Sequence, residues 1–148
     1  MKTIFDKATR DELIGRINTL TENSEAQWGK MNVYQMIEHC IRWEEMISGE
    51  IICKQAFIGR LFGKMALKGL LKDESPLRRS TPTSPELRVA ETNGDVAAEK
   101  ERWIVLIGQN ANSSNSGFIH PFFGKMTKEQ VGYLAYKHID HHLRQFNS

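Results

Sequence analysis

Apolar residues recur at intervals of three and four along much of the chain, the spacing of a helix that buries one face. The first such stripe consists of Leu13, Ile17 and Leu20. It stops at the polar run 21–24, and Thr9 followed by Glu12 precedes it in the form of a capping box. We therefore expect a first helix that Thr9 caps.

A second stripe follows Asn32, a residue type that caps helix N-termini, and it ends before Gly49. Its members share one face at the same spacing: Met36, His39, Cys40, Trp43, Met46 and Ile47. This pattern predicts a second helix, and it places the imidazole of His39 on the face that points into the core.

The segment 55–72 mixes large apolar residues with arginine and lysine at helical spacing, despite three glycines. It predicts a third helix. Residues 73–95 hold three of the four prolines together with serines, threonines and Asn93-Gly94. That composition breaks regular structure, so we expect a long crossover loop there.

Two more helices complete the pattern. Asp95 is placed to cap a helix that passes through Trp103 and ends in the loop 108–117. Thr127 with Gln130 forms another capping box and opens a last helix that reaches Phe146. Alternation typical of strands is almost absent.

These elements predict an all-α fold, a four-helix bundle with a long crossover connection and an additional short helix. The chain has 148 residues, of which 40% are hydrophobic. One core of ordinary size accounts for that length, so we expect a single domain over residues 1–148.

Composition narrows the classes of function. A net charge of +2 from 20 basic and 18 acidic residues is far from the positive field of a nucleic-acid binder. No apolar run approaches the length of a membrane span. Cys40 and Cys53 lie in helical segments and the N-terminus lacks the apolar region of a signal peptide, which predicts a reducing, cytoplasmic location.

The candidate chemistry lies in the last helix, where His138 and His142 are four residues apart. One helical turn therefore places both imidazoles on one side, within reach of a single metal ion. At about 100° per residue they share the stripe of Val131 and Leu134, so they point inward. Buried imidazoles need partners, and a metal ion supplies one to both. His39, inward on another helix, is the natural third ligand.

Three imidazoles leave coordination positions open, as reactive metal sites do. Such a site can activate water or a thiol, and the imidazole donor set suits zinc, nickel, copper and iron, with zinc slightly favoured by its availability. The alternative is a degenerate site that holds no metal.

Other polar residues near these histidines have ordinary interpretations beside the chemical ones. His141 is a candidate to contact the ligands or a solvent-facing residue, and Gln145 either positions a ligand or packs the helix. Cys40 is interpreted as a buried thiol in preference to a fourth ligand or a nucleophile. His120 is interpreted as forming a turn hydrogen bond in preference to approaching the metal from its loop. Glu38, Glu44 and Glu45 are candidate general bases for a metal hydrolase. We favour the ordinary interpretation, in which Glu38 with Arg42 and Asp140 with Arg144 form surface pairs four residues apart.

The segment 54–79 carries seven basic and two acidic residues, a local charge of 7 − 2 = +5. A basic amphipathic helix binds anionic lipid or an acidic partner. The alternative is a helix of the bundle, or of a dimer surface, whose polar face is rich in lysine. We favour the second interpretation from the sequence.

Three stretches resemble the DUF1569 branch of the DinB-like superfamily: Trp28–His39, His120–Gly124 and Tyr136–Phe146. Related families carry a histidine on the second helix and a histidine pair followed by glutamine on the last. These positions correspond to His39, His138, His142 and Gln145. The resemblance implies an up-down-down-up bundle, often dimeric, with the histidines around zinc, nickel or iron.

The resemblance also implies a small-molecule substrate. Some relatives transfer low-molecular-weight thiols or act as isomerases and hydrolases on thiol conjugates, whereas the DUF1569 branch has no assigned reaction. We therefore expect a metal-dependent hydrolase or thiol transferase. The alternative is a non-enzymatic helical scaffold, or a dimeric stress-related protein, with a degenerate metal site.

Overall fold

A computed structural model describes residues 1–113 and 117–148 of the chain. Within these residues it contains α1 (Lys7–Thr19), α2 (Val33–Ser48), α3 (Phe57–Leu70), η1 (Pro85–Leu87), α4 (Val96–Asn112), β1 (Ile119–His120), β2 (Gly124–Lys125) and α5 (Lys128–Gln145). The predicted all-α class is confirmed, since the described strands form only a two-stranded hairpin.

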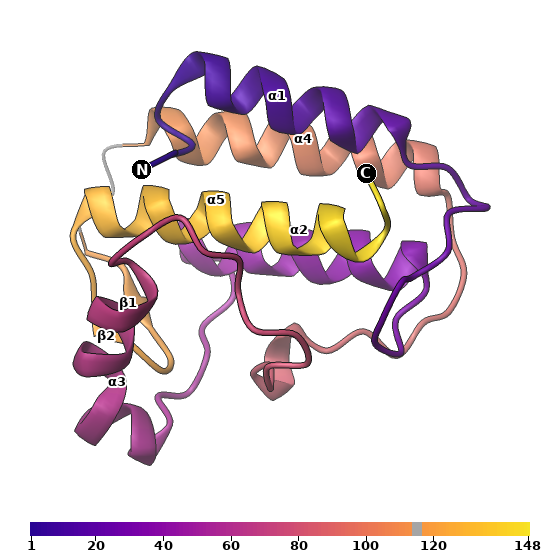
Figure 1. Ribbon diagram of the computed structural model, residues 1–148. Coiled ribbons are helices and arrows are strands. Elements are labelled where there is room, and N and C mark those ends of the chain that lie inside the picture. Colours follow the sequence, from indigo (N-terminus) through magenta and orange to yellow (C-terminus); the bar gives the residue numbers. More distant parts are fainter. Residues whose placement is uncertain (114–116) are drawn as a thin grey trace.

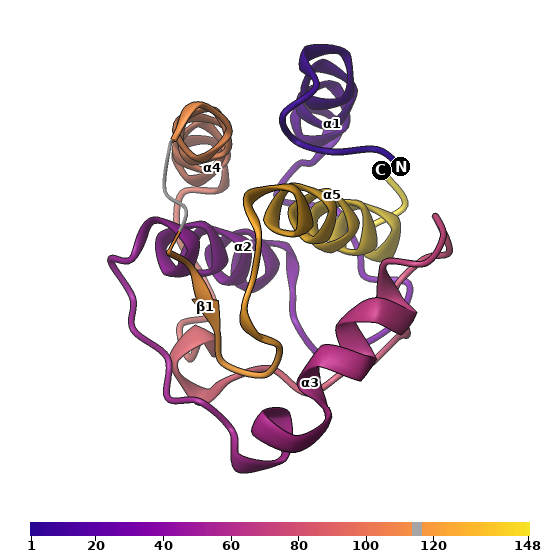
Figure 2. The ribbon, with the colours of Figure 1, turned by 90° about the vertical axis from the view of Figure 1, so that its left-hand side faces the viewer.

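Four helices, α1, α2, α4 and α5, form the bundle, and α3 lies outside it (Figures 1 and 2). Following the chain in Figure 1, α1 and α5 run in one direction and α2 and α4 in the other, which is the up-down-down-up order. Because α2 and α4 are parallel neighbours, the chain between them must return along the bundle. Residues 49–95 make this crossover and contain α3 and η1.

The core lies between the four bundle helices, and each contributes two or more fully buried side chains. These are Leu13 and Ile17 of α1, Met36, Ile37 and Ile41 of α2, Trp103 and Ile107 of α4, and Ile139 and Leu143 of α5. Their spacings of four residues, and of one residue in α2, give each helix a single apolar face, as the sequence pattern requires.

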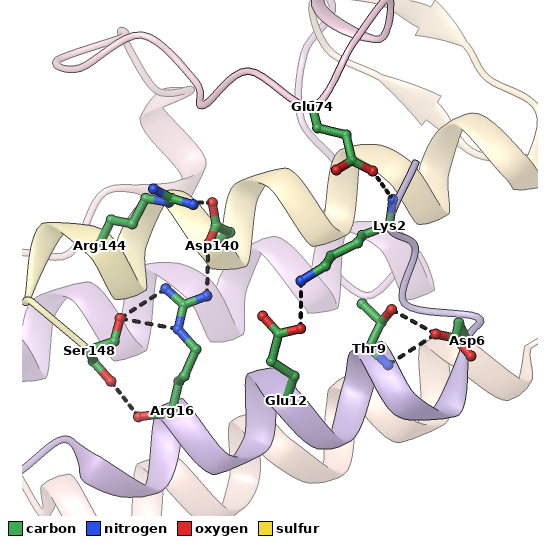
Figure 3. Close-up of polar contacts among 9 residues, drawn as sticks. All are labelled: Lys2, Asp6, Thr9, Glu12, Arg16, Glu74, Asp140, Arg144 and Ser148. Atoms are coloured by element: carbon green, nitrogen blue, oxygen red, sulfur yellow. Dashed lines mark hydrogen bonds and ion pairs between the residues drawn. The ribbon is translucent and has the colours of Figure 1, made fainter.

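The predicted start of α1 is wrong. Asp6, not Thr9, caps the helix: its carboxylate accepts the backbone N–H of Thr9 at 3.1 Å and the Thr9 hydroxyl at 2.8 Å (Figure 3). Glu12 instead bonds the ammonium of Lys2 at 2.6 Å. A carboxylate that satisfies an N-terminal N–H is as good a cap as a threonine, so the helix begins three residues earlier than the Thr9 capping box required.

Helix α4 continues past the predicted stop at Gly108 and ends at Asn112. One glycine within a helix costs only about 1 kcal/mol, and the side chain of Asn112 donates to the carbonyl of Gly108 at 2.8 Å. The extra turn places Asn110 against α2, where its amide bonds the buried carboxylate of Glu44 at 2.7 Å. Residues 114–116 of the predicted loop lie outside the described residues.

The short β1–β2 hairpin was not predicted. His120 pairs with Gly124 and Ile119 with Lys125. Strands of two residues each are too short to produce a recognisable alternation of polar and apolar positions. The hairpin matters because α3 packs on it: the N–H of Ala56, just before α3, donates to the carbonyl of Pro121 at 2.9 Å.

Asp140 is not the surface residue that the sequence suggested. It is 5% exposed, and its carboxylate bonds Arg144 and Arg16 at 2.7 Å each (Figure 3). The same Arg16 guanidinium bonds the backbone oxygen of Ser148. This network ties α1 to the end of α5.

The predicted surface pair of Glu38 with Arg42 is replaced by two ion pairs with other residues. Glu38 lies 3.9 Å from Arg102 of α4, and Arg42 lies 3.6 Å from Glu91. Both ion pairs therefore join different elements instead of two turns of α2. None of the described helices is long and apolar enough to cross a membrane.

Candidate metal centre

His39 reaches the interior of the bundle from α2. The predicted cap Asn32 starts this helix in a full capping box with Gln35, which fixes the phase of the apolar face. The ring is 5% exposed, and its Nδ1 lies 3.0 Å from the carbonyl oxygen of Leu87 in η1. A carbonyl only accepts, so Nδ1 carries the proton and the lone pair is on Nε2.

His142 reaches the same point from α5, which begins at the predicted capping box of Thr127 and Gln130. Its Nδ1 lies 2.9 Å from Oε1 of Gln145, whose Nε2 donates to the carbonyl of Trp28 at 2.8 Å. Because the amide nitrogen of Gln145 is committed to that carbonyl, its oxygen must face the ring. His142 is therefore also protonated on Nδ1, and its Nε2 is free to bind.

Gly29, in the loop before α2, allows the Trp28 carbonyl to approach the Gln145 amide closely. Gly29 has a φ of +85°, and a Cβ there would lie 2.6 Å from the amide nitrogen of Gln145. Only glycine combines that backbone conformation with that space. The Trp28 carbonyl can therefore hold the amide that orients His142.

His138, one turn before His142, completes the cluster. Its Nε2 is 3.3 Å from Nε2 of His39, and one nitrogen from each of the three rings lies within 4.8 Å of the others. Two nitrogens bound to one tetrahedral zinc at about 2.0–2.1 Å are about 3.4 Å apart. The closest pair already has that separation, so the residues fit a single ion.

The environment of the cluster keeps the imidazoles neutral, the form that binds metal. Burial lowers the pKa of His142 to about 3, with a smaller effect from His39. Burial also lowers the pKa of His39, although the Leu87 carbonyl opposes the change. Burial, with the neighbouring rings, sets the pKa of His138 well below 6.5.

His138 differs from the other two rings in its surroundings. The indole of Trp43 stacks on it at 4.5 Å and 13° between planes. Its Nδ1 has no hydrogen-bond partner among the described residues, so no acceptor fixes its tautomer. His138 as a whole residue is half-buried, whereas His39 and His142 are buried, but its Nδ1 is itself shielded from solvent.

Neither His141 nor Cys40 belongs to the cluster. His141 lies outside it and packs its ring against Trp28 at 5.8 Å and against His142 at 5.1 Å. The Cys40 thiol is buried 3.8 Å from the sulfur of Met36, and burial raises its pKa well above 9.0. It stays a protonated thiol, as predicted, and it does not join the histidines.

His120 has the turn role that the sequence suggested. Its Nδ1 accepts the backbone N–H groups of Phe122 and Phe123 at 3.1 and 3.2 Å. Burial lowers its pKa to about 4, so the ring stays neutral and keeps this lone pair for the turn.

Sequence reasoning missed two contacts of the cluster. The stacking of Trp43 on His138 had a signal, because Trp43 shares the inner stripe of α2 one turn after His39. The Leu87 carbonyl had none, since a backbone oxygen in a crossover loop leaves no mark on the residue pattern.

Comparison with known proteins adds one finding. No curated protein and no solved structure gives a significant match. A family model described as "Protein of unknown function (DUF1569)" matches residues 5–148, nearly the whole chain and all three histidines. The wider DinB-like relationship stays a prediction. The chain belongs to the DUF1569 family.

Proposed function

We propose that His39, His138 and His142 hold one divalent transition metal ion and that the protein is a metal-dependent enzyme acting on a small molecule. The observation that supports this is the convergence of one ring nitrogen from each residue within 4.8 Å. His39 and His142 have their other nitrogens committed to oxygen acceptors, so both offer lone pairs to the same space.

Three packed histidines without a metal are a weaker explanation of this arrangement. A hydrogen bond from His138 to His39 would use one proton across the 3.3 Å gap, but it does not involve His142. The orienting contacts of Leu87 and Gln145 would then serve no purpose beyond packing. A metal ion gives all three lone pairs a common partner.

The contacts of the three histidine rings determine how a substrate could approach the metal. His39 and His142 are held rigidly by the Leu87 carbonyl and the Gln145 amide, while Trp43 covers one face of His138. A substrate would approach the metal beside His138, the least buried of the three histidine residues. The bound metal would supply a Lewis acid that lowers the pKa of water or of a thiol.

Hydrolysis of a small molecule and transfer of a low-molecular-weight thiol both fit such a site. Imidazole ligands suit zinc, nickel and iron, and zinc is favoured because it is readily available. Neither Glu44 nor Glu38 of α2 is placed to act as a general base beside the metal. Glu44 is fully buried on the side of α4, and Glu38 faces Arg102.

The test is elemental analysis of protein purified without an affinity tag or chelator. We expect about one equivalent of metal in the wild type and almost none after replacement of both His138 and His142 by alanine. His141→Ala, on the same helix, is the matched control and should retain the metal. Loaded protein should then hydrolyse model esters or react with thiol conjugates.

Wild-type protein that is metal-free and takes up neither zinc nor nickel would refute the metal centre. A loaded protein without turnover on any ester or thiol conjugate would refute the enzyme while leaving the metal site. That second result would favour the scaffold alternative.

A further inference from the structure

Helix α3 packs against the rest of the protein through glycine. It lies beside the β1–β2 hairpin, outside the four-helix bundle (Figure 2), and its last residue Leu70 accepts a hydrogen bond from Lys137 of α5 at 2.8 Å. A Cβ at Gly59 or at Gly63 would overlap the backbone carbonyl of Phe122. These two glycines, together with buried Leu67, form the face of α3 that contacts the protein.

The opposite face of α3 carries its large apolar side chains, and they are exposed. The exposed fractions are 74% for Phe57, 63% for Ile58, 65% for Leu61, 52% for Phe62 and 69% for Met65. At about 100° per residue these five lie within one arc that faces away from Gly59 and Gly63. We call these five residues the outer face of α3.

Exposed apolar surface of this extent on one helix marks an interaction site. From the sequence we expected a helix that buries its large apolar side chains in the bundle or in a dimer surface. In the structure α3 instead buries its glycine face and exposes the large apolar side chains. Close approach of two backbones at the glycines replaces the usual burial of large side chains. The outer face therefore has no partner among the described residues.

Charge identifies the kind of partner. Arg60 and Lys64 border the outer face on one side, and Lys68 lies at its edge between Phe57 and Leu61. Lys72 follows the helix, and α3 itself contains no acidic residue. A second copy packed face to face would bring the same cations together, which is unfavourable. An anionic surface complements both the cations and the apolar arc.

We propose that the outer face of α3 binds the surface of an anionic lipid bilayer. The helix would lie in the plane of the interface with its five apolar side chains in the acyl boundary, and Arg60 and Lys68 would reach the headgroups. Lys64 is directed elsewhere, because its ammonium donates to the carbonyl of Lys125 in the hairpin. The binding is peripheral, since none of the described helices can span a bilayer. It does not depend on the metal centre.

The test is sedimentation of the full chain with vesicles of phosphatidylcholine alone or mixed equally with phosphatidylglycerol. We expect binding to the anionic vesicles only, with release between about 0.05 and 0.5 M NaCl. Arg60→Glu with Lys68→Glu should lower the partition coefficient at least about thirtyfold. Leu61→Ser should lower it about tenfold.

Matched controls are Lys30→Glu with Arg88→Glu, and Val105→Ser, which is 55% exposed on α4. Both should bind as the wild type does, and circular dichroism checks that every variant is folded. Wild-type protein that stays in solution with anionic vesicles overturns the proposal. Equal losses in control and α3 variants also overturn it, as does a wild-type dimer that Leu61→Ser dissociates without any vesicle binding.

Discussion

Glu44 is a buried carboxyl group whose ionisation should control stability near neutral pH. It is 0% exposed; one oxygen accepts the Asn110 amide at 2.7 Å, and the other has no partner among the described residues. Burial raises its pKa from 4.5 to about 7, although the Asn110 hydrogen bond opposes the change. The folded protein therefore favours the protonated carboxyl.

The sign of the effect follows from proton linkage. The unfolded chain loses this proton near pH 4.5 and the folded chain near pH 7, so the stabilisation is fully present below 4.5 and is lost as pH rises to 7. At about 1.4 kcal/mol per pH unit, the free energy of unfolding should fall by about 3 kcal/mol over that interval.

Urea denaturation of wild type and Glu44→Gln between about pH 4 and 8, with a chelator present, measures this effect. Glutamine does not titrate, so the variant should gain about 3 kcal/mol relative to wild type as pH rises. The histidines have lowered pKa values and therefore make both proteins more stable as pH rises. This contribution cancels when the free energy of unfolding of wild type is subtracted from that of the variant. Exposed Glu101→Gln is the control. Parallel curves for wild type and Glu44→Gln would show that the Glu44 carboxyl does not titrate with a raised pKa in the folded protein.

Three further predictions use other contacts. Asp140→Ala should cost about 3 kcal/mol in urea, because it leaves two arginines without their buried partner, and Arg144→Ala, at an exposed residue, less than about 1 kcal/mol; equal losses would contradict the burial argument. Gly63→Ala should force α3 off the hairpin and speed proteolysis of α3 about tenfold. Gly69→Ala should leave proteolysis unchanged, because an added Cβ there has no neighbouring atom within 4 Å. Equal cleavage of the two variants would contradict the packing of α3 through Gly63. Gln145→Leu should weaken metal affinity about 10–100-fold in competition with a chelating dye, and unchanged affinity would show that the His142 contact is unimportant.

Helix positions were largely predictable because caps and apolar spacing agree. Asn32 and Thr127 cap α2 and α5 as expected, and both boxes are complete. The errors arose where two local signals competed. Asp6 and Thr9 are both good caps, and only the fold decides between them. Gly108 weakens a helix without ending it, since the Asn110 contact with Glu44 favours a longer α4.

The inward position of the histidines was predictable from the phase of each helix, but their meeting was not. His39 and His138 are far apart in sequence, and only the arrangement of α2 and α5 brings their nitrogens to 3.3 Å. The same limit applies to α3: its residue pattern predicts an amphipathic helix, while the choice of a glycine face for packing depends on the shape of the hairpin. The cytoplasmic location and the homodimer stay predictions.

Anomalous diffraction from crystals of zinc-loaded protein, measured above the zinc absorption edge, tests the metal centre most directly. We expect one anomalous peak between α2 and α5, within about 2.0–2.1 Å of the Nε2 atoms of His39, His138 and His142. A peak at any other residues, or no peak in protein that has been loaded with zinc, would contradict it.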